Sequence, residues 1–300
     1  MTIDHDGRGF IVEDGLWRGH SLYELYSTAR TPWEWHEALF AKGHEFGITV
    51  FSSAFDSTAV DLLESLKTPA YKIASLEIVD LPLIRRVAAT GKPLVLSTGA
   101  ANFKEIEEAV SAARSAGCRE LVLTHCTSGY PTPAKESNLR TIPDLACEFS
   151  VVPGLSDHTL GTAVSVAAIS LGAAVIEKHF TLRRADGGAD AAFSLEPEEF
   201  ARLVDDCRTA WEALGRVSYD LAPSEIQAHL CRRSLYAVAD IAQGEILSER
   251  NVRSIRPGFG LPPKNLTDIL GKVARRAIKR GTPLSWEDIA VENLTGAKTG

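Results

Sequence analysis

Short apolar runs alternate with longer helical segments along the chain from residue 48 onward. The runs are rich in Val, Ile and Leu, and they are Ile48–Phe51, Ala70–Ala74, Pro93–Leu96, Glu120–Leu123, Val151–Gly154 and Val175–Glu177. In the segment Glu105–Ala116 the apolar residues recur at the spacing of one helical face. Nearly continuous apolar strands that are each followed by a helix predict a parallel sheet buried on both faces.

The pattern gives six βα units, whereas a complete (β/α)8 barrel has eight. Before residue 48 there is one good helical segment, Pro32–Gly47, preceded by a loop at Gly15–His20. Two interpretations remain open, an open six-stranded sheet and a (β/α)8 TIM-type barrel whose first two strands are missing at the N-terminus. Both predict an α/β fold.

A second region begins near residue 223, after a helix expected at Glu198–Leu214 and a linker helix at residues 224–229. Its short apolar pieces are broken by Gly and Pro, and they are Arg232–Val238, Ile241–Leu247, Asn251–Ile255, Lys272–Ile278 and Thr282–Trp286. This pattern favours a small β-rich domain. We therefore expect a catalytic domain at residues 1–222 and a linker with a small domain at residues 223–300.

Composition narrows the classes of function. The chain is 45% hydrophobic and 24% charged, with a net charge of −7, which does not suggest a nucleic-acid-binding surface. No apolar run approaches the ~20 residues of a membrane span, and the first residues do not resemble a signal peptide. The five cysteines are scattered, which favours neither a disulfide framework nor a thiolate zinc site. We expect a cytoplasmic protein without a membrane or nucleic-acid partner.

Polar residues follow every apolar run, where a barrel places its reactive groups. His158 and His179 follow the last two runs, and two imidazoles completed by water suit Mn, Fe, Co or Zn. The alternative is that each histidine ends a strand and hydrogen-bonds a carboxylate such as Asp157 or Glu177. For a single histidine we would favour that alternative, but two at equivalent strand ends favour a shared ion.

Serine is frequent at the same strand ends. The hydroxyls of Ser53, Ser75, Ser97 and Ser156, together with the ammonium of Lys72, have the chemistry of a phosphate-binding cradle. The alternative is that these serines only satisfy backbone groups where strands end. A Gly-rich acidic loop at residues 186–190 has the chemistry to bind a metal, to cap the next helix or to bind sugar hydroxyls.

Several motifs resemble those of the sialic acid synthase family, and together they span nearly the whole chain. In the first part they are YKIASLE (71–77), LSTG (96–99), GLSDHT (154–159), EKHFT (177–181) and DGGADAAFSLEPEEF (186–200). In the tail, RRSLYAVADIAQGE (232–245), NVRSIRPGFGL (251–261) and AIKRGTPLSWEDI (277–289) resemble that family's antifreeze-like SAF domain. The segments GLWRGHSLYELYSTARTPWEWH (15–36) and CTSGYP (126–131) look like its pseudaminic acid branch.

The resemblance implies roles for individual residues. The metal, Mn²⁺ or else Mg²⁺ or Co²⁺, is expected on His158 and His179, which with Glu77 form the catalytic set. Phosphoenolpyruvate is expected on Ser53, Lys72, Ser75, Ser97, Ser128 and Ser156. The sugar is expected on Glu77, Tyr130 and Asp190. Arg256 of the tail is expected to reach the N-acyl group in the partner's site, which implies a domain-swapped homodimer.

The reaction implied is that of a transferase in carbohydrate biosynthesis. It condenses phosphoenolpyruvate with 2,4-diacetamido-2,4,6-trideoxy-L-altrose to give a nine-carbon ulosonic acid. One alternative is an N-acetylneuraminate or legionaminate synthase that uses an N-acylated mannosamine-type sugar. Members of this family usually begin with a strand that carries an IAEIG motif and a strand that ends in VKFQ. Neither motif is found in this sequence, so the general-base Glu and the phosphate-binding Lys that they supply are not found either. An inactive remnant is therefore a second alternative, and the tail argues against an unrelated metal-dependent aldolase.

Overall fold

A computed structural model describes residues 2–290. The chain forms two compact units, Met1–Gly215 and Arg216–Gly300. The domain boundary expected between residues 222 and 223 stays a prediction. None of the described helices is both long enough and apolar enough to cross a membrane.

The larger unit is built on a six-stranded sheet whose strands follow one another in chain order and run parallel. The strands are β1 (Ser52–Ser53), β2 (Tyr71–Ile73), β3 (Leu94–Ser97), β4 (Leu121–Cys126), β5 (Val152–Asp157) and β6 (Val175–Lys178). The expected α/β class is confirmed, as six parallel strands of a partial TIM barrel. A barrel would close β1 onto further strands, whereas here β1 and β6 are the edges of the sheet.

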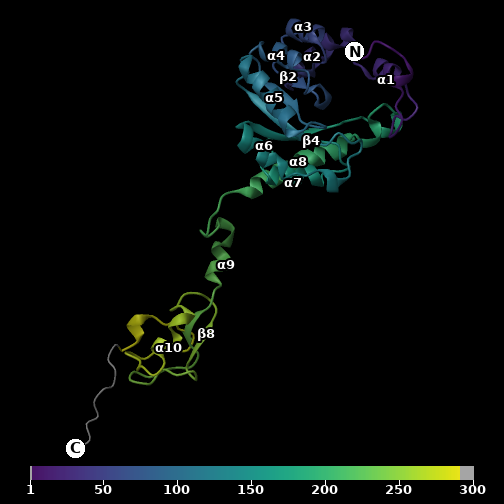
Figure 1. Cartoon of the computed structure of the whole chain (residues 1–300). Coiled ribbons are helices and arrows are strands. Elements are labelled where there is room, and N and C mark those ends of the chain that lie inside the picture. Colours follow the sequence, from purple (N-terminus) through teal and green to yellow (C-terminus); the bar gives the residue numbers. More distant parts are fainter. Residues whose placement is uncertain (1, 291–300) are drawn as a thin grey trace, which may run out of the picture. The chain divides into compact units, whose positions relative to one another are not determined.

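Helices connect the strands and lie around the outside of the sheet (Figure 1). In this unit they are α1 (Leu22–Ala29), α2 (His36–Glu45), α3 (Ser57–Ser65), α4 (Leu81–Ala88), α5 (Phe103–Ser115), α6 (Thr141–Phe149), α7 (Ala163–Ser170) and α8 (Pro197–Leu214). Side chains of the first residues fix where several of them begin. Asn102 and Glu105 form a capping box at α5, and Asp56 and Asp80 accept backbone N–H groups at α3 and α4.

The core lies between the sheet and these helices. Tyr71, Ile73, Leu94, Leu96 and Leu123 of the strands are fully buried against apolar faces of the helices. Burying each such side chain stabilises the fold by roughly 1.5–3 kcal/mol. The packing therefore fixes the strand order, and with it the strand ends that carry the polar residues.

Several expected bounds differ from the structure. Strands β4 and β5 run three residues further than expected, to Cys126 and Asp157, and two differences lie before β2. The helix predicted at Pro32–Gly47 is a 3-10 turn at Trp33–Trp35 followed by α2, which ends before Gly47, a residue in the left-handed region at φ 67°. The first strand, predicted at Ile48–Phe51, instead occupies Ser52–Ser53. Its register explains the shift, because β2 offers backbone partners only from Tyr71, which lies opposite Ser52.

The smaller unit is β-rich, as expected, but little of it is in ladders. Strands β7 (Ser234–Ala237) and β8 (Val252–Ile255) pair antiparallel, while the other apolar pieces make only isolated bridges. Helix α9 (Ile226–Leu230) lies before β7, and α10 (Leu266–Ile269) follows β8. The buried core includes Leu235, Leu247 and Leu284. Glycines at positive φ, such as Gly244 and Gly281, turn the chain too often for long strands.

Gly154 of β5 provides a test of how tightly the sheet is packed. A Cβ there would lie 2.8 Å from the carbonyl oxygen of Val175 on β6 and 2.9 Å from a methyl group of Thr124 on β4. We expect Gly154→Ala to lower the free energy of unfolding by on the order of 2 kcal/mol, because neither neighbour has room to move. Gly9→Ala is the matched control, since a Cβ at Gly9 meets nothing within 4 Å. Denaturant unfolding measures both, and equal stability of the two variants would contradict the packing.

Candidate functional site

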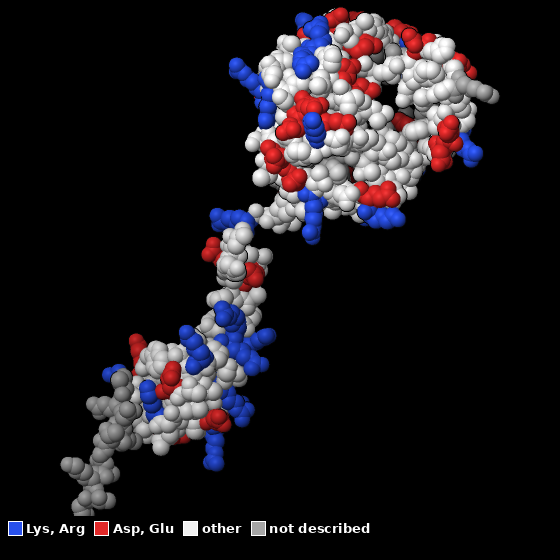
Figure 2. Space-filling model, viewed as in Figure 1, with Lys and Arg blue, Asp and Glu red and all other residues white. Residues whose placement is uncertain are grey.

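The carboxyl end of the sheet gathers most of the residues predicted from the strand ends. In the register, Ser53 lies opposite Lys72, and Ser156 lies between Cys126 and Glu177. Figure 2 shows the larger unit hollowed at its centre. Polar side chains of separate strands therefore meet at the carboxyl ends of the strands, as the βα pattern predicted.

Lys72 forms an ion pair with Glu177, and this contact joins β2 to β6. Glu177 binds Lys72 Nζ through Oε2 and accepts a hydrogen bond from Ser156 Oγ through Oε1 at 2.9 Å. Burial alone would raise the pKa of the Glu177 carboxyl, but the charge and hydrogen bond of Lys72, with the Ser156 hydroxyl, hold it below its ordinary value. The predicted binding residues Lys72 and Ser156 are thus together, and both are held by one carboxylate.

A second group of hydroxyls surrounds Gly99, directly after β3. The Gly99 N–H donates to Ser75 Oγ at 3.2 Å. A Cβ at Gly99 would come within 2.3 Å of Ser128 Oγ, 2.7 Å of Ser75 Oγ and 3.0 Å of Cys126 Sγ. Ser97 faces the neighbouring strand, where its hydroxyl lies 2.7 Å from Thr124 Oγ1. Glycine is needed at residue 99 because a side chain would fill the space that these groups line.

A cavity of about 480 Å³ lies beside this group. Its lining includes Ser128 and Cys126, together with Thr98, His125 and Glu136, but neither His158 nor His179. The cavity therefore adjoins the strand-end site and does not contain its two histidines.

His158 and His179 are brought together as the sequence predicted. Their ring centroids are 5.2 Å apart, and the rings are inclined at 61°. His158 Nδ1 lies 3.0 Å from the carbonyl oxygen of Thr127, and His179 Nδ1 lies 3.4 Å from a carboxylate oxygen of Asp190. Acceptors at both Nδ1 atoms place the proton there and leave the two Nε2 atoms free as ligands.

This pair fits an open metal site. Imidazole nitrogens bind divalent ions at about 2.1 Å, so two rings on one ion have centroids roughly 4.5–5.5 Å apart. Within residues 2–290, no His, Cys, Asp or Glu side chain completes a three-residue metal-binding group with the pair. Water and a substrate oxygen would fill the remaining positions, whereas a structural ion takes all its ligands from the protein.

Among the described residues, the carboxylate beside a histidine is Asp190, which lies 3.4 Å from His179 Nδ1, while Asp157 and Glu177 pair with lysines. A histidine held by a carboxylate therefore stays an alternative for His179. Asp157 turns to the opposite side and pairs with Lys178 at 2.9 Å, with both side chains 1% exposed. It also accepts hydrogen bonds from Ser165 Oγ at 2.6 Å and the Thr159 N–H at 2.8 Å. Asp157 and Lys178 therefore tie together the two strand ends that carry the histidines.

Aromatic rings line the histidine side of the site. Tyr130 packs on His158 at a centroid distance of 4.4 Å and on Phe193 at 5.3 Å. Trp17 reaches Tyr130 from the N-terminal segment at 5.5 Å, and its indole N–H donates to the carbonyl oxygen of Ala189 at 2.9 Å. Segments far apart in the sequence thus share one wall, which places Tyr130 and Asp190 beside the two imidazoles.

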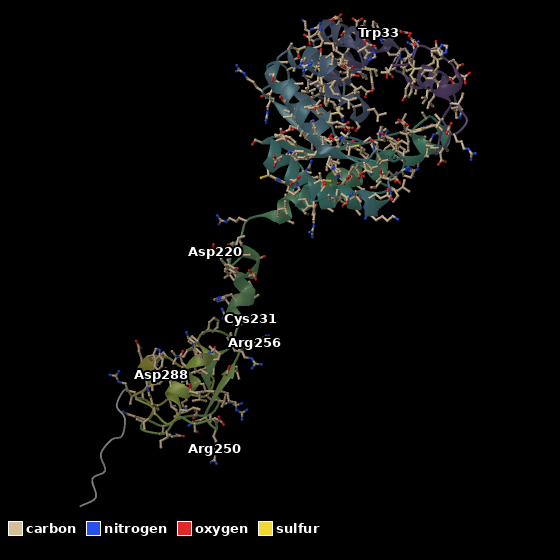
Figure 3. The ribbon with its side chains drawn as sticks, viewed as in Figure 1. Trp33, Asp220, Cys231, Arg250, Arg256 and Asp288 are labelled. Atoms are coloured by element: carbon tan, nitrogen blue, oxygen red, sulfur yellow. The ribbon has the colours of Figure 1, made fainter. Side chains whose placement is uncertain are left out.

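Glu77 and Arg256 are the remaining predicted residues. Glu77 ends a 3-10 turn, Ser75–Glu77, directly after β2, and burial raises the pKa of its carboxyl. Arg256 belongs to the smaller unit, where it is exposed just beyond β8 (Figure 3).

Three contributors were missed in the sequence, namely Glu177, Cys126 and Trp17. Glu177 was considered only as a histidine partner, although its place two residues before His179 puts both on the same face of the strand. Cys126 Sγ lies 3.8 Å from His158 Nδ1. For Trp17 the only signal was a large aromatic residue in a glycine-flanked loop, between Gly15 and Gly19.

Known proteins resemble this chain along almost its whole length. The NeuB family model matches residues 2–219, and the SAF domain model matches residues 232–290. Pseudaminic acid synthase of Helicobacter pylori is 41% identical over 290 residues, which are 96% of this chain and 85% of that protein. N,N'-diacetyllegionaminic acid synthase of Campylobacter jejuni is 39% identical over 81% of this chain and 74% of that protein. This chain also resembles the crystal structure of the spore coat polysaccharide biosynthesis protein spsE of Bacillus subtilis, with a TM-score of 0.61 and 32% sequence identity. The match covers 96% of this chain and 86% of that chain.

The buried pair of Asp157 and Lys178 can be tested separately from activity. We expect Lys178→Met to lower the free energy of unfolding by about 3–5 kcal/mol, because it leaves the Asp157 carboxylate buried and unpaired. Lys42→Met is the control, since Lys42 pairs with Glu45 on the surface and such pairs contribute under about 1 kcal/mol. Adding Asp157→Leu to Lys178→Met should recover part of the loss in chemical denaturation. A loss no larger than that of the control would show that the pair does not hold the strand ends.

Proposed function

The chain belongs to the NeuB family of nonulosonic acid synthases, and on that premise we propose that it is a pseudaminic acid synthase. In the proposed reaction C3 of phosphoenolpyruvate bonds to C1 of open-chain 2,4-diacetamido-2,4,6-trideoxy-L-altrose. Water adds at C2, and inorganic phosphate leaves by cleavage of the C–O bond. The observation that carries the proposal is the similarity to the Helicobacter pylori synthase along almost the whole chain.

Phosphoenolpyruvate would be held by the hydroxyls and the ammonium at the strand ends. Ser75 and Ser128 converge on the space beside Gly99, and neutral donors of this kind suit a phosphate group. Lys72 and Ser156 supply a cation and a further donor a short distance away. Ser53 and Ser97 complete the proposed set from the ends of β1 and β3. Fixed donors on several strands orient the enol carbon before the bond forms.

The sugar would lie against the aromatic side of the site. Tyr130 packs on His158, and Asp190 lies beside His179, which supports a role for both in contacting the hydroxyl or N-acetyl groups of a bound sugar. We assign Glu77, whose carboxyl has a pKa raised by burial, one of two roles. It would transfer a proton, or it would stabilise the positive charge that develops at C2 of phosphoenolpyruvate. His158 and His179 would hold the divalent metal, most suitably Mn²⁺, with Mg²⁺ or Co²⁺ as substitutes. The bound ion supplies Lewis-acid polarisation of the sugar aldehyde.

A second candidate is a legionaminate or N-acetylneuraminate synthase, which uses an N-acylated mannosamine-type sugar. The similarity to the Campylobacter jejuni diacetyllegionaminic acid synthase favours it, although that similarity covers less of the chain. The residues that bind phosphoenolpyruvate would be the same in both enzymes. The shape of the sugar pocket decides between them, so the discriminating measurement is a comparison of sugars.

We also propose a domain-swapped homodimer in the cytoplasm. The segment 1–215 carries 30 Asp and Glu against 19 Lys and Arg, whereas the segment 216–300 carries 9 against 13. Lys and Arg are prominent on the smaller unit in Figure 2. Opposite net charges favour docking of the small unit of one protomer on the large unit of its partner. All five cysteines are free thiols, which is typical of a reducing compartment.

The proposed reaction is tested with the full chain, phosphoenolpyruvate, Mn²⁺ and each candidate sugar, following release of phosphate. We expect turnover with the diacetamido altrose, and a loss in kcat/KM on the order of 10³-fold for His158→Ala and for His179→Ala. The exposed His44 of α2 provides the control variant, His44→Ala, with unchanged activity. Turnover only with a mannosamine-type sugar would favour the second candidate. A folded chain that releases no phosphate with any sugar would favour the inactive remnant.

The role proposed for Arg256 predicts a selective defect. Arg256→Ala should raise KM for the sugar by about tenfold through loss of a hydrogen bond from a charged donor, and leave KM for phosphoenolpyruvate unchanged. Arg250→Ala is a matched control, because Arg250 is another exposed arginine of the same small unit (Figure 3). Sedimentation should give a dimer for the natural chain and for both variants. If Arg256→Ala and Arg250→Ala have the same KM for the sugar, Arg256 does not contact the sugar.

A further inference from the structure

The ammonium that the proposed function gives to the substrate already has a partner within the chain. Lys72 of β2 is paired with Glu177 of β6. The two strands are separated by β3, β4 and β5 in the sheet order. The pair is therefore not a contact between neighbouring strands. It spans the interior of the curled sheet, where the substrate is expected.

The contact has the form of a carboxylate bound at two points. One oxygen of Glu177 is held by Lys72 Nζ, and the other accepts from Ser156 Oγ at 2.9 Å. Both donors are among the residues assigned to phosphoenolpyruvate, whose own carboxylate presents two oxygens with the same spacing. A carboxylate of this chain already occupies both donors, so their spacing accepts a planar group with two oxygens. The donors thus form a subsite with the shape of a carboxylate.

The partners differ in their freedom to move. The Lys72 side chain is 7% exposed, whereas that of Glu177 is 45% exposed. Ser156 is buried as well. The donors are thus fixed within the packed sheet, and the carboxylate that they hold has open space beside it. An exchange in which Glu177 leaves and a ligand enters would require no movement of the strands.

We propose that Glu177 is a built-in occupant of this carboxylate subsite, which the carboxylate of the substrate displaces on binding. A buried ammonium without a counter-charge is destabilising, so Glu177 keeps Lys72 neutralised while no substrate is bound. Binding then exchanges one carboxylate for another. The apparent affinity is reduced by the fraction of chains in which Glu177 holds the subsite. The identity of the ligand as phosphoenolpyruvate rests on the proposed function, but the subsite itself does not.

The test is binding to the full chain without metal or sugar, measured by calorimetry for phosphoenolpyruvate and by NMR titration for pyruvate and inorganic phosphate. Glu177→Gln removes the competing charge and keeps the side-chain volume. We expect it to lower the Kd of phosphoenolpyruvate and of pyruvate by about tenfold, the effect of one charged hydrogen bond. Inorganic phosphate, which lacks a carboxylate, should bind the variant and the natural chain alike.

Two further variants keep the result interpretable. Glu177→Asp has a side chain too short to reach both donors, and it should give an intermediate gain in a protein that keeps a counter-charge near Lys72. Glu120→Gln removes an exposed carboxylate at the opposite end of the sheet, just before β4, and should change nothing. Thermal unfolding of each variant establishes that the proteins compared are folded.

Pyruvate affinity that is unchanged or weaker in both Glu177 variants would overturn the inference, as would an equal gain for inorganic phosphate. Failure of pyruvate to bind any of the proteins would also overturn it. The proposed function is judged separately, by phosphate release from the natural chain. Suppose that Glu177→Gln binds pyruvate more tightly, but the natural chain releases no phosphate with any of the sugars. That result would support the carboxylate subsite and contradict the proposed synthase activity.

Discussion

The ion pair between Lys72 and Glu177 requires a sheet that curls until its second and sixth strands face each other. In a flat sheet, four strand spacings of ~4.8 Å would separate them by ~19 Å, more than the two side chains can span. The helices packed on the outside and the apolar side chains beneath them hold this curl. The meeting of Lys72 with Glu177 and Ser156 depends on this curl, whereas the two imidazoles follow the neighbouring strands β5 and β6.

The alternation of side chains along a strand explains how one pair of strand ends performs two tasks. Asp157 and Lys178 lie opposite each other in the register of β5 and β6 and are buried on one side. The residue that follows each strand is a histidine, and the two imidazoles lie together away from that ion pair. A buried ion pair is costly to form, but it fixes one register, and a slip of one residue would exchange the two faces. The structural pair thus determines the separation of the two imidazoles.

Binding of an anion by an acidic chain raises a physical problem, which the site solves locally. The larger unit has an excess of carboxylates, so its overall field repels an anion such as phosphoenolpyruvate, the substrate proposed above. In the proposed site, attraction would come from one buried ammonium and a group of neutral hydroxyls, where a low dielectric strengthens each contact. The same low dielectric makes an unpaired Lys72 unfavourable. The Glu177 carboxylate lies beside Lys72 because a cation in the interior of the protein needs a counter-charge.

The sequence by itself determined the six βα units, the small β-rich tail and the strand ends that carry His158, His179 and Lys72. These follow from local periodicity and from the rule that parallel strands end at one edge, neither of which needs coordinates. It could not place the first strand, because Ile48–Phe51 has strand character but no partner, and pairing decides where a strand lies. Nor could it show that Glu177 holds Lys72 and Ser156, or that Trp17 reaches Tyr130. The Lys72–Glu177 and Trp17–Tyr130 contacts join residues more than 100 positions apart, and only the curvature of the folded sheet and the path of the N-terminal segment bring them within reach.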